Sequence, residues 1–470
     1  MLKMQLDPFT PAARVSQAVA NGDVTAERVA AAALERIKTL NPSVNAFTLL
    51  TEERALSEAR AIDAARARGD TLGPLAGVPF AVKNLFDLEG ETTRAGAKVT
   101  AADPSATRDG DLVGKLCAAG AVCVGALHMG EFAYDFTGEN AHAGPCRNPH
   151  DLERMTGGSS SGSGAAVGSG MVPLSLGSDT NGSLRVPASL CGVFSLKPTY
   201  GRLSRGGSYP FVDALDHVGP LARTVEDLAI AYDALQGPST RDHGQASRRE
   251  EPIGRPDPSR PIRVGVVKGW FDERSTEAAI EARETVLNAL EGPAVEVTFD
   301  AVEAGRAAAY LITNGQAGTW HLPRLRENAA EFDPDTRDRF LAGALLPAAW
   351  LEKAQRVRRW WLNEVLKAFE SVDLIVCPAT PEVAPFIGQK TLMIGGQEVP
   401  LRPNLGLLAQ PFSAIGLPVL TVPVERGKPL PLGVQLIAAP WRERVAFSAA
   451  ARLAAAGVAV APHPAGLQLN

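Results

Sequence analysis

Apolar residues in the first quarter of the chain recur at two different spacings, which predict helices followed by a buried strand. Residues 26–40 and 51–68 carry apolar positions three and four residues apart with charged residues between them, as in helices that bury one face. Residues 73–87 change to a short apolar run preceded by Gly and Pro, which predicts a buried strand with Lys83 near its end. Residues 111–129 read as a helix and then a strand, an order that indicates an α/β sheet.

The second half of the chain repeats this alternation with longer helices. Short apolar runs predict strands over 262–267, 294–300 and 373–379, and the segment between about 300 and 370 is rich in helical periodicity. Residues 237–260 are polar and Pro-rich, which makes them the best candidate for a linker. We therefore expect an α/β protein without internal repeats.

Composition and charge restrict the class of partner. The chain has 470 residues, of which 45% are apolar and 21% charged, enough to bury a large core in one big domain or two ordinary ones. The net charge of −5 gives no general attraction to nucleic acid or to an anionic membrane. No segment approaches the ~18 apolar residues of a membrane span. We expect a cytoplasmic protein whose partner is a small molecule or another protein.

The cysteines are too few and too irregularly spaced to form a disulfide framework or a metal cluster. We interpret all five as small buried apolar residues. They are Cys117, Cys123, Cys146, Cys191 and Cys377.

The first stretch with unusual chemistry is Gly/Ser-rich and covers residues 156–170. A flexible linker is one interpretation, but the stretch runs directly into Ala165–Val167, which favours a tight loop that opens a helix. Such a loop aligns backbone N–H groups that can hold an anion or oxyanion. A phosphate-binding P-loop is excluded because no Gly-Lys-Ser/Thr follows the glycines. Residues 158–162 also match the G-x-S-x-G nucleophile elbow, but segment 150–157 is too polar for the buried strand that an elbow requires.

The second such stretch, GSDTNGSLRVPAS over residues 177–189, is rich in hydroxyl, amide and charged side chains. A surface turn is one interpretation of these residue types. Apolar segments on both sides indicate instead a loop buried in the protein. Because an unsatisfied buried polar group costs about 1–3 kcal/mol, a buried loop of this kind needs a reason.

Together these motifs resemble the amidase signature family. The likeness begins in AGVPFAVKNLFD, includes GGSSSGSGAAV and GSDTNGSLRVPASLCGVFSLKP, and returns in QPFSAIGLPVLTVPV and LPLGVQLIAAP, so it covers most of the chain. It implies a single α/β domain over residues 1–470, with a central mixed β-sheet flanked by helices on both faces. The expected parts are N-terminal helices (1–70), a signature core (71–237), a polar linker (238–261) and a C-terminal half (262–470).

The resemblance also implies an amidohydrolase with three catalytic side chains. The family lysine that follows the buried strand corresponds to Lys83. The first serine of the Gly-Gly-Ser-Ser motif, held in a cis peptide in relatives, corresponds to Ser159. The serine that closes the second motif, Ser183, is the expected nucleophile and the site of an acyl-enzyme. No cofactor and no metal are implied.

Elementary chemistry supports these roles. A serine hydroxyl needs an adjacent base to become a good nucleophile, and no histidine lies in either Gly/Ser loop. A buried neutral lysine is a suitable base, provided that its pKa falls by roughly 3 units from about 10.4. Burial beside the apolar run that ends at Lys83 supplies such a shift, and Ser159 would pass the proton from Ser183 to this amine.

Further polar residues of the two loops are expected to support the triad. Backbone N–H groups are implied as an oxyanion hole, formed by Thr180, Asn181, Gly182 and Ser183. Side chains are expected to hold the lysine and the loops, with hydrogen bonds from Ser160 and Ser178 and a pair between Asp179 and Arg185. Each is equally an ordinary polar loop residue.

Two positions depart from the common family pattern. Ser161 and Asn181 stand where a glycine is usual. Asn181 still offers a backbone N–H, and its side chain would narrow the pocket and add hydrogen-bond donors, which suits a small polar substrate.

Within the family, residues 177–220 are most similar to amidases that hydrolyse 1-carboxybiuret, a small urea-like dicarbonyl. That likeness implies a small-molecule amide or ureide substrate, release of ammonia and a small helical accessory subunit; the chain is also open to forming a homo-oligomer. One alternative is the glutaminase subunit of the tRNA-dependent amidotransferase, and another is a non-catalytic binding scaffold. Asn181 and the segment 300–370 argue against the glutaminase.

The remaining expectations concern the pocket wall and one helix. Tyr134, Thr313 and Asn314 are candidates for the pocket wall, with a buried structural role as the alternative. A substrate carboxylate would need an arginine, which the sequence does not identify. In the amphipathic helix predicted over 350–369, the adjacent Trp360 and Trp361 cannot face the same side, so one of them is expected to be partly exposed.

Overall fold

One large mixed sheet organises the computed structural model, which describes residues 7–467. The sheet has eleven strands in the order β1-β3-β2-β6-β8-β7-β14-β15-β11-β9-β10. Their bounds, in the same order, are Phe47–Leu50, Val122–Leu127, Pro79–Lys83, Leu174–Asp179, His217–Ala222, Phe194–Lys197, Val419–Val424, Leu432–Ala438, Leu374–Pro378, Val264–Val267 and Val295–Val297. The sheet is mixed and flanked by helices, as the family resemblance implied.

Two small hairpins lie outside this sheet. Their strands are β4 (Arg147–Asn148) with β5 (Asp151–Met155), and β12 (Thr391–Ile394) with β13 (Gln397–Pro400).

Helices occur in each segment where the periodicity predicted them, and further helices occur in segments for which no prediction was made. Those of the first half are α1 Ala12–Asn21, α2 Ala26–Val44, α3 Glu52–Ala67, α4 Asp111–Ala118, η1 Glu131–Ala133, α5 Ser161–Gly168, α6 Arg185–Cys191 and α7 Val225–Leu235. Those of the second half are α8 Trp270–Glu273, α9 Glu277–Leu290, α10 Val302–Asn328, η2 Ala329–Glu331, α11 Pro334–Ala344, α12 Ala348–Ala368, α13 Leu401–Asn404, α14 Gln410–Ser413 and α15 Glu443–Ala455.

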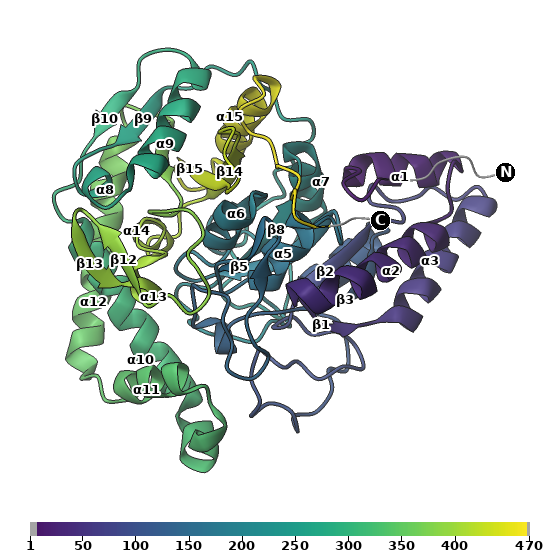
Figure 1. The fold of residues 1–470 in the computed structure, drawn as a ribbon, viewed down its shortest axis with the longest axis horizontal. Coiled ribbons are helices and arrows are strands. Elements are labelled where there is room, and N and C mark those ends of the chain that lie inside the picture. Colours follow the sequence, from purple (N-terminus) through teal and green to yellow (C-terminus); the bar gives the residue numbers. More distant parts are fainter. Residues whose placement is uncertain (1–6, 468–470) are drawn as a thin grey trace.

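The N-terminal helices and the predicted helix-rich segment lie at opposite ends of the molecule. Figure 1 shows α1–α3 beside β1–β3 at one end, and α10–α12 as an arm at the other. Helix α2 begins where the side chain of Thr25 accepts from the N–H of Arg28, and its buried stripe includes Val29 and Leu34. It continues past the predicted end at residue 40 to Val44, with Pro42 inside its last turn. The segment between α7 and β9 contains no helix or strand.

Burial follows the predicted apolar faces in most positions. Trp361 is 1% exposed and Trp360 42%, so the two adjacent tryptophans face opposite environments, as predicted. Four cysteines are buried, whereas Cys117 is only partly buried, beside Glu58. Within the described range, no helix combines the length and the apolar content needed to cross a bilayer.

Candidate active site

The sheet topology brings the two predicted motifs together. Strands β2 and β6 are parallel neighbours, with Val82 opposite Leu176. Parallel neighbours end at the same edge of a sheet, so Lys83 at the end of β2 lies beside Ser178 near the end of β6. The Nζ of Lys83 is 2.8 Å from the Oγ of Ser178.

Lys83 is fully buried. Its exposed fraction is 0%, and its Nζ is 2.6 Å from the Oγ of Ser159. Burial lowers the pKa of Lys83 to about 7, although the negative charges of Asp179, Asp216 and Asp135 act in the opposite direction. A large fraction of this amine is therefore neutral near pH 7.

The Gly/Ser-rich stretch forms a tight loop followed by α5, as predicted. The peptide bond between Gly158 and Ser159 is cis. Ser160 fastens this loop to β6, because its Oγ donates to the carbonyl of Ser178 at 3.1 Å and accepts from the N–H of the same residue at 3.2 Å. At Gly162, a Cβ would lie 2.3 Å from the carbonyl oxygen of Ala46, so only glycine fits.

Ser161, one of the departures from the family pattern, has its own anchor. Its Oγ lies 2.8 Å from the Nδ1 of His128 and donates to the carbonyl oxygen of that residue at 3.1 Å. Both residues are fully buried. The serine at this position therefore fixes the loop to the end of β3.

The second motif is a buried turn held by one ion pair. Asp179 and Arg185 are both fully buried and lie 2.9 Å apart. Burial by itself raises the pKa of Asp179, but the charge and hydrogen bonds of Arg185 outweigh it and hold the pKa well below its ordinary value. The carboxylate also accepts from the N–H groups of Gly182 at 2.7 Å and Leu184 at 3.2 Å. The N–H of Gly182, expected to serve the oxyanion hole, thus already has an acceptor within the turn.

Other contacts of this turn come from distant parts of the chain. The Oγ1 of Thr180 donates to the carboxylate of Asp216 at 2.6 Å. The side-chain amide of Asn181 donates to the Oγ1 of Thr313 on α10 at 2.9 Å. Ser183 is 3% exposed and borders a cavity.

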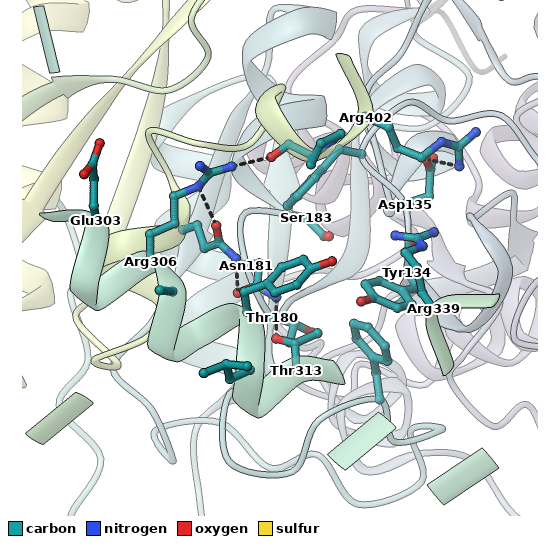
Figure 2. A pocket seen from close by; sticks show the side chains of 18 residues that line it. Tyr134, Asp135, Thr180, Asn181, Ser183, Glu303, Arg306, Thr313, Arg339 and Arg402 are labelled. Atoms are coloured by element: carbon teal, nitrogen blue, oxygen red, sulfur yellow. Dashed lines mark hydrogen bonds and ion pairs between the residues drawn. The ribbon is translucent and has the colours of Figure 1, made fainter. Parts of the chain in front are cut away.

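This cavity has a volume of about 700 Å³ and lies between the turn and the helical arm. Figure 2 shows Ser183 near the centre of the view, with Arg306 and Asn181 on one side and Tyr134 and Arg339 on the other. The residues that line the cavity include Ala133, Tyr134, Asp135, Phe136, Thr180, Asn181, Ser183, Phe211, Glu303, Arg306, Tyr310, Leu311, Thr313, Arg339, Arg402 and Gln410.

The residues that line the cavity include some that were predicted for its wall and others that the sequence did not indicate. Tyr134 and Thr313 line the cavity, as predicted. Asn314 does not line it; its side chain accepts a hydrogen bond from the hydroxyl of Tyr134. Arg306 and Arg339 were missed, because helical periodicity does not distinguish a pocket-facing arginine from a solvated one. Over residues 7–467, no group of three metal-ligating side chains occurs.

Comparison with known proteins agrees with this arrangement. A family model described as Amidase matches residues 28–446. The chain is 50% identical over 450 residues to AtzE of Pseudomonas sp. (strain ADP), a 1-carboxybiuret hydrolase subunit, covering 95% of this chain and 98% of the relative. It is 35% identical over 464 residues to a glutamyl-tRNA(Gln) amidotransferase subunit of Symbiobacterium thermophilum, covering 92% and 93%.

A solved structure resembles the chain in both sequence and fold. It is described as a vestigial protein complex, with inhibitor bound, that reveals the evolutionary origins of an s-triazine catabolic enzyme. It matches with a TM-score of 0.94 at 48% identity, covering 96% of this chain and 100% of the solved chain. With a family model that spans most of its length and relatives of this similarity, the chain belongs to the amidase family and is an amidase signature hydrolase.

Proposed function

We propose that the protein hydrolyses a C–N bond of a small urea-like amide through an acyl-enzyme on Ser183. The observation that carries the proposal is the 2.6 Å contact between Lys83 Nζ and Ser159 Oγ, in a site where burial lowers the pKa of the lysine to about 7. A neutral amine at this position is a competent general base near neutral pH.

In the first half of the reaction the Oγ of Ser183 attacks the substrate carbonyl carbon. Its proton passes to the Oγ of Ser159 while the hydroxyl proton of Ser159 moves to the neutral Nζ of Lys83. When the C–N bond breaks, the leaving nitrogen takes a proton from Ser159, which regains one from Lys83, and the amine leaves. Water then attacks the acyl group by the same route, which releases the acid and restores Ser183.

Charge that develops on the carbonyl oxygen needs donors beside Ser183. The backbone N–H groups of Thr180, Asn181 and Ser183 are the candidates, since that of Gly182 donates to Asp179. The bond from Asn181 to Thr313 would keep this part of the turn fixed during the reaction.

We infer that the substrate is 1-carboxybiuret or a similar small ureide and that the reaction releases ammonia. Two observations support this: the 50% identity to one subunit of the 1-carboxybiuret hydrolase, and the Asn181 side chain, which adds a polar group to the cavity beside Ser183. The 35% identity to an amidotransferase subunit makes glutamine the second candidate substrate.

The test is an ammonia-release screen on carboxybiuret, biuret, allophanate, glutamine and simple aliphatic and aryl amides. We expect turnover of the ureides and none by the Ser183→Ala variant. A fluorophosphonate should label the parent enzyme and not this variant. Turnover of glutamine alone would support the amidotransferase alternative, turnover of aryl amides alone would exclude a ureide substrate, and no labelling at all would indicate a binding scaffold.

We also infer that a second protein accompanies this chain as an accessory subunit. The relative at 50% identity is itself named as one subunit of its enzyme, and the similar solved structure is a protein complex. Co-expression with genes that neighbour this one, followed by light scattering, tests it. A single species at the mass of one 49.4 kDa chain under all conditions would exclude both a homo-oligomer and this subunit.

A further inference from the structure

Three arginines line the cavity, and they differ in what surrounds their positive charge. Arg402 is neutralised by carboxylates, since it lies 2.9 Å from Asp135 and 3.2 Å from Asp335. The positive charge of this guanidinium is therefore neutralised within the protein, and the two ion pairs connect the loop that contains Asp135 to α11.

Arg339 connects α11 to the same loop. Its Nη2 donates to the carbonyl oxygen of Tyr134 at 2.6 Å, its Nε donates to that of Asp335 at 2.7 Å, and its guanidinium lies 3.7 Å from the centre of the Tyr134 ring. These contacts hold the guanidinium flat against the ring of Tyr134, with two neutral carbonyl oxygens as its acceptors, on the side of the cavity away from Arg306.

Arg306 on α10 also has neutral oxygens as its acceptors, in contrast to Arg402. Its Nε donates to the Oε1 of Gln410 at 3.0 Å, and its Nη2 donates to the carbonyl oxygen of Pro403 at 2.7 Å and to the Oδ1 of Asn404 at 3.1 Å. Among residues 7–467, no carboxylate oxygen lies within 4 Å of this guanidinium and no acceptor contacts its Nη1. A half-buried cation that is oriented but not neutralised attracts an anion of the right size.

Glu303, the acidic residue closest to Arg306 in the sequence, forms an ion pair with a different arginine. Glu303 lies one turn earlier on α10, but its carboxylate pairs with Arg274 at 2.9 Å. Burial and the positive charge of Arg274 lower the pKa of Arg306, and together they outweigh the negative charge of Glu303, which raises it, so a bound anion would relieve an unfavourable environment.

Hydrogen bonds connect Arg306 to the turn of the nucleophile. Gln410 accepts from Arg306, and its Nε2 donates to the Oδ1 of Asn181 at 3.4 Å. Asn181 in turn donates to Thr313, which lies two helical turns after Arg306 on α10. Figure 2 shows this chain of contacts along one side of the cavity, with Ser183 beside it. An anion at Arg306 would thus be held in a fixed position relative to Ser183.

We propose that Arg306 binds the carboxylate of the substrate and makes the enzyme selective for carboxylated over uncharged amides. This inference rests on the proposed function, since it concerns the substrate of the same site. A guanidinium offers paired N–H donors to a carboxylate, and an uncharged analogue leaves them unmatched.

The first experiment compares kcat/KM for 1-carboxybiuret and for biuret, which lacks the carboxylate. Arg306→Met should lower the value for carboxybiuret by about 10- to 100-fold, mainly through KM, and that for biuret by less than about threefold. Arg306→Lys should retain part of the selectivity. The matched control is Arg326→Met, which removes the same charge from an exposed position of the same helix and should change neither value. An equal loss on both substrates, or a selective loss in Arg339→Met instead, would overturn the assignment.

The second experiment separates this inference from the proposed reaction. Malonamate and its uncharged counterpart malonamide are titrated by calorimetry into Ser183→Ala with and without Arg306→Met. We expect malonamate binding alone to weaken by about 10- to 100-fold. If that holds while the enzyme does not hydrolyse carboxybiuret, the proposed substrate is wrong and the anion site stands. If carboxybiuret is hydrolysed but binding is independent of Arg306, the anion site is wrong and the proposed function stands.

Discussion

The proposed mechanism predicts that activity follows the ionisation of Lys83. Burial lowers the pKa of this lysine from 10.5 to about 7, and only the neutral amine can accept a proton. The value of kcat/KM should therefore rise with pH through about 7 and reach a plateau above it. At pH 5 it should be about 1% of the plateau, because each unit below the pKa reduces the neutral fraction tenfold.

The size of the effect follows from the same shift. An amine with the ordinary pKa of 10.5 would be only about 0.03% neutral at pH 7, whereas this one is about half neutral, a gain of about 10³-fold in active base. The assay is ammonia release from pH 5 to 9 at constant ionic strength, with Lys83→Met as the comparison. A flat profile in the parent enzyme, or a rising limb that survives in Lys83→Met, would refute the reasoning.

Stability gives an independent measure of the same pKa. Between pH 7 and 9 the unfolded chain keeps the proton of Lys83 while the folded chain has lost it, so the unfolded state binds more protons and stability rises with pH. Relative to Lys83→Met, the parent protein should gain about 1 kcal/mol of unfolding free energy per pH unit in this window. Urea unfolding followed by tryptophan fluorescence measures it, and a pH-independent difference would mean that the folded lysine stays charged.

Three further predictions concern positions outside the proton relay. Arg185→Met leaves the buried carboxylate of Asp179 without its partner and should destabilise the protein by about 3–5 kcal/mol in urea unfolding; a loss below about 1 kcal/mol would mean that the pair is not essential to the turn. Trp361→Ala should cost about 3–5 kcal/mol, whereas Trp360→Ala at the neighbouring exposed position should stay within about 0.5 kcal/mol, and similar values for both would contradict the observed burial. Asn181→Gly keeps the backbone N–H and should leave kcat within about tenfold while raising KM, because a lost side-chain hydrogen bond costs about 1 kcal/mol; loss of all turnover would show that the side chain itself is essential.

Elements with strong local signals were predicted well. Lys83 at the end of a buried strand, the loop before α5 and the opposite environments of Trp360 and Trp361 follow from periodicity and turn residues that operate over a few positions. The two Gly/Ser motifs also contain Ser159 and Ser178, the serines whose hydroxyl groups lie within hydrogen-bonding distance of Lys83 in the structure.

The sequence by itself determined which reactive side chains the chain carries and in what local setting: one lysine at the end of an apolar strand and two serine-rich turns between apolar segments. Only the tertiary structure decided what surrounds these groups. Asp216 reaches Thr180, and Gln410 reaches Asn181 from more than two hundred residues away, through contacts that leave no periodic trace. The charge of a pocket depends on which distant side chains neutralise one another. Arg402 and Arg306 look alike along the chain, and they differ because folding places carboxylates beside the first and neutral oxygens beside the second.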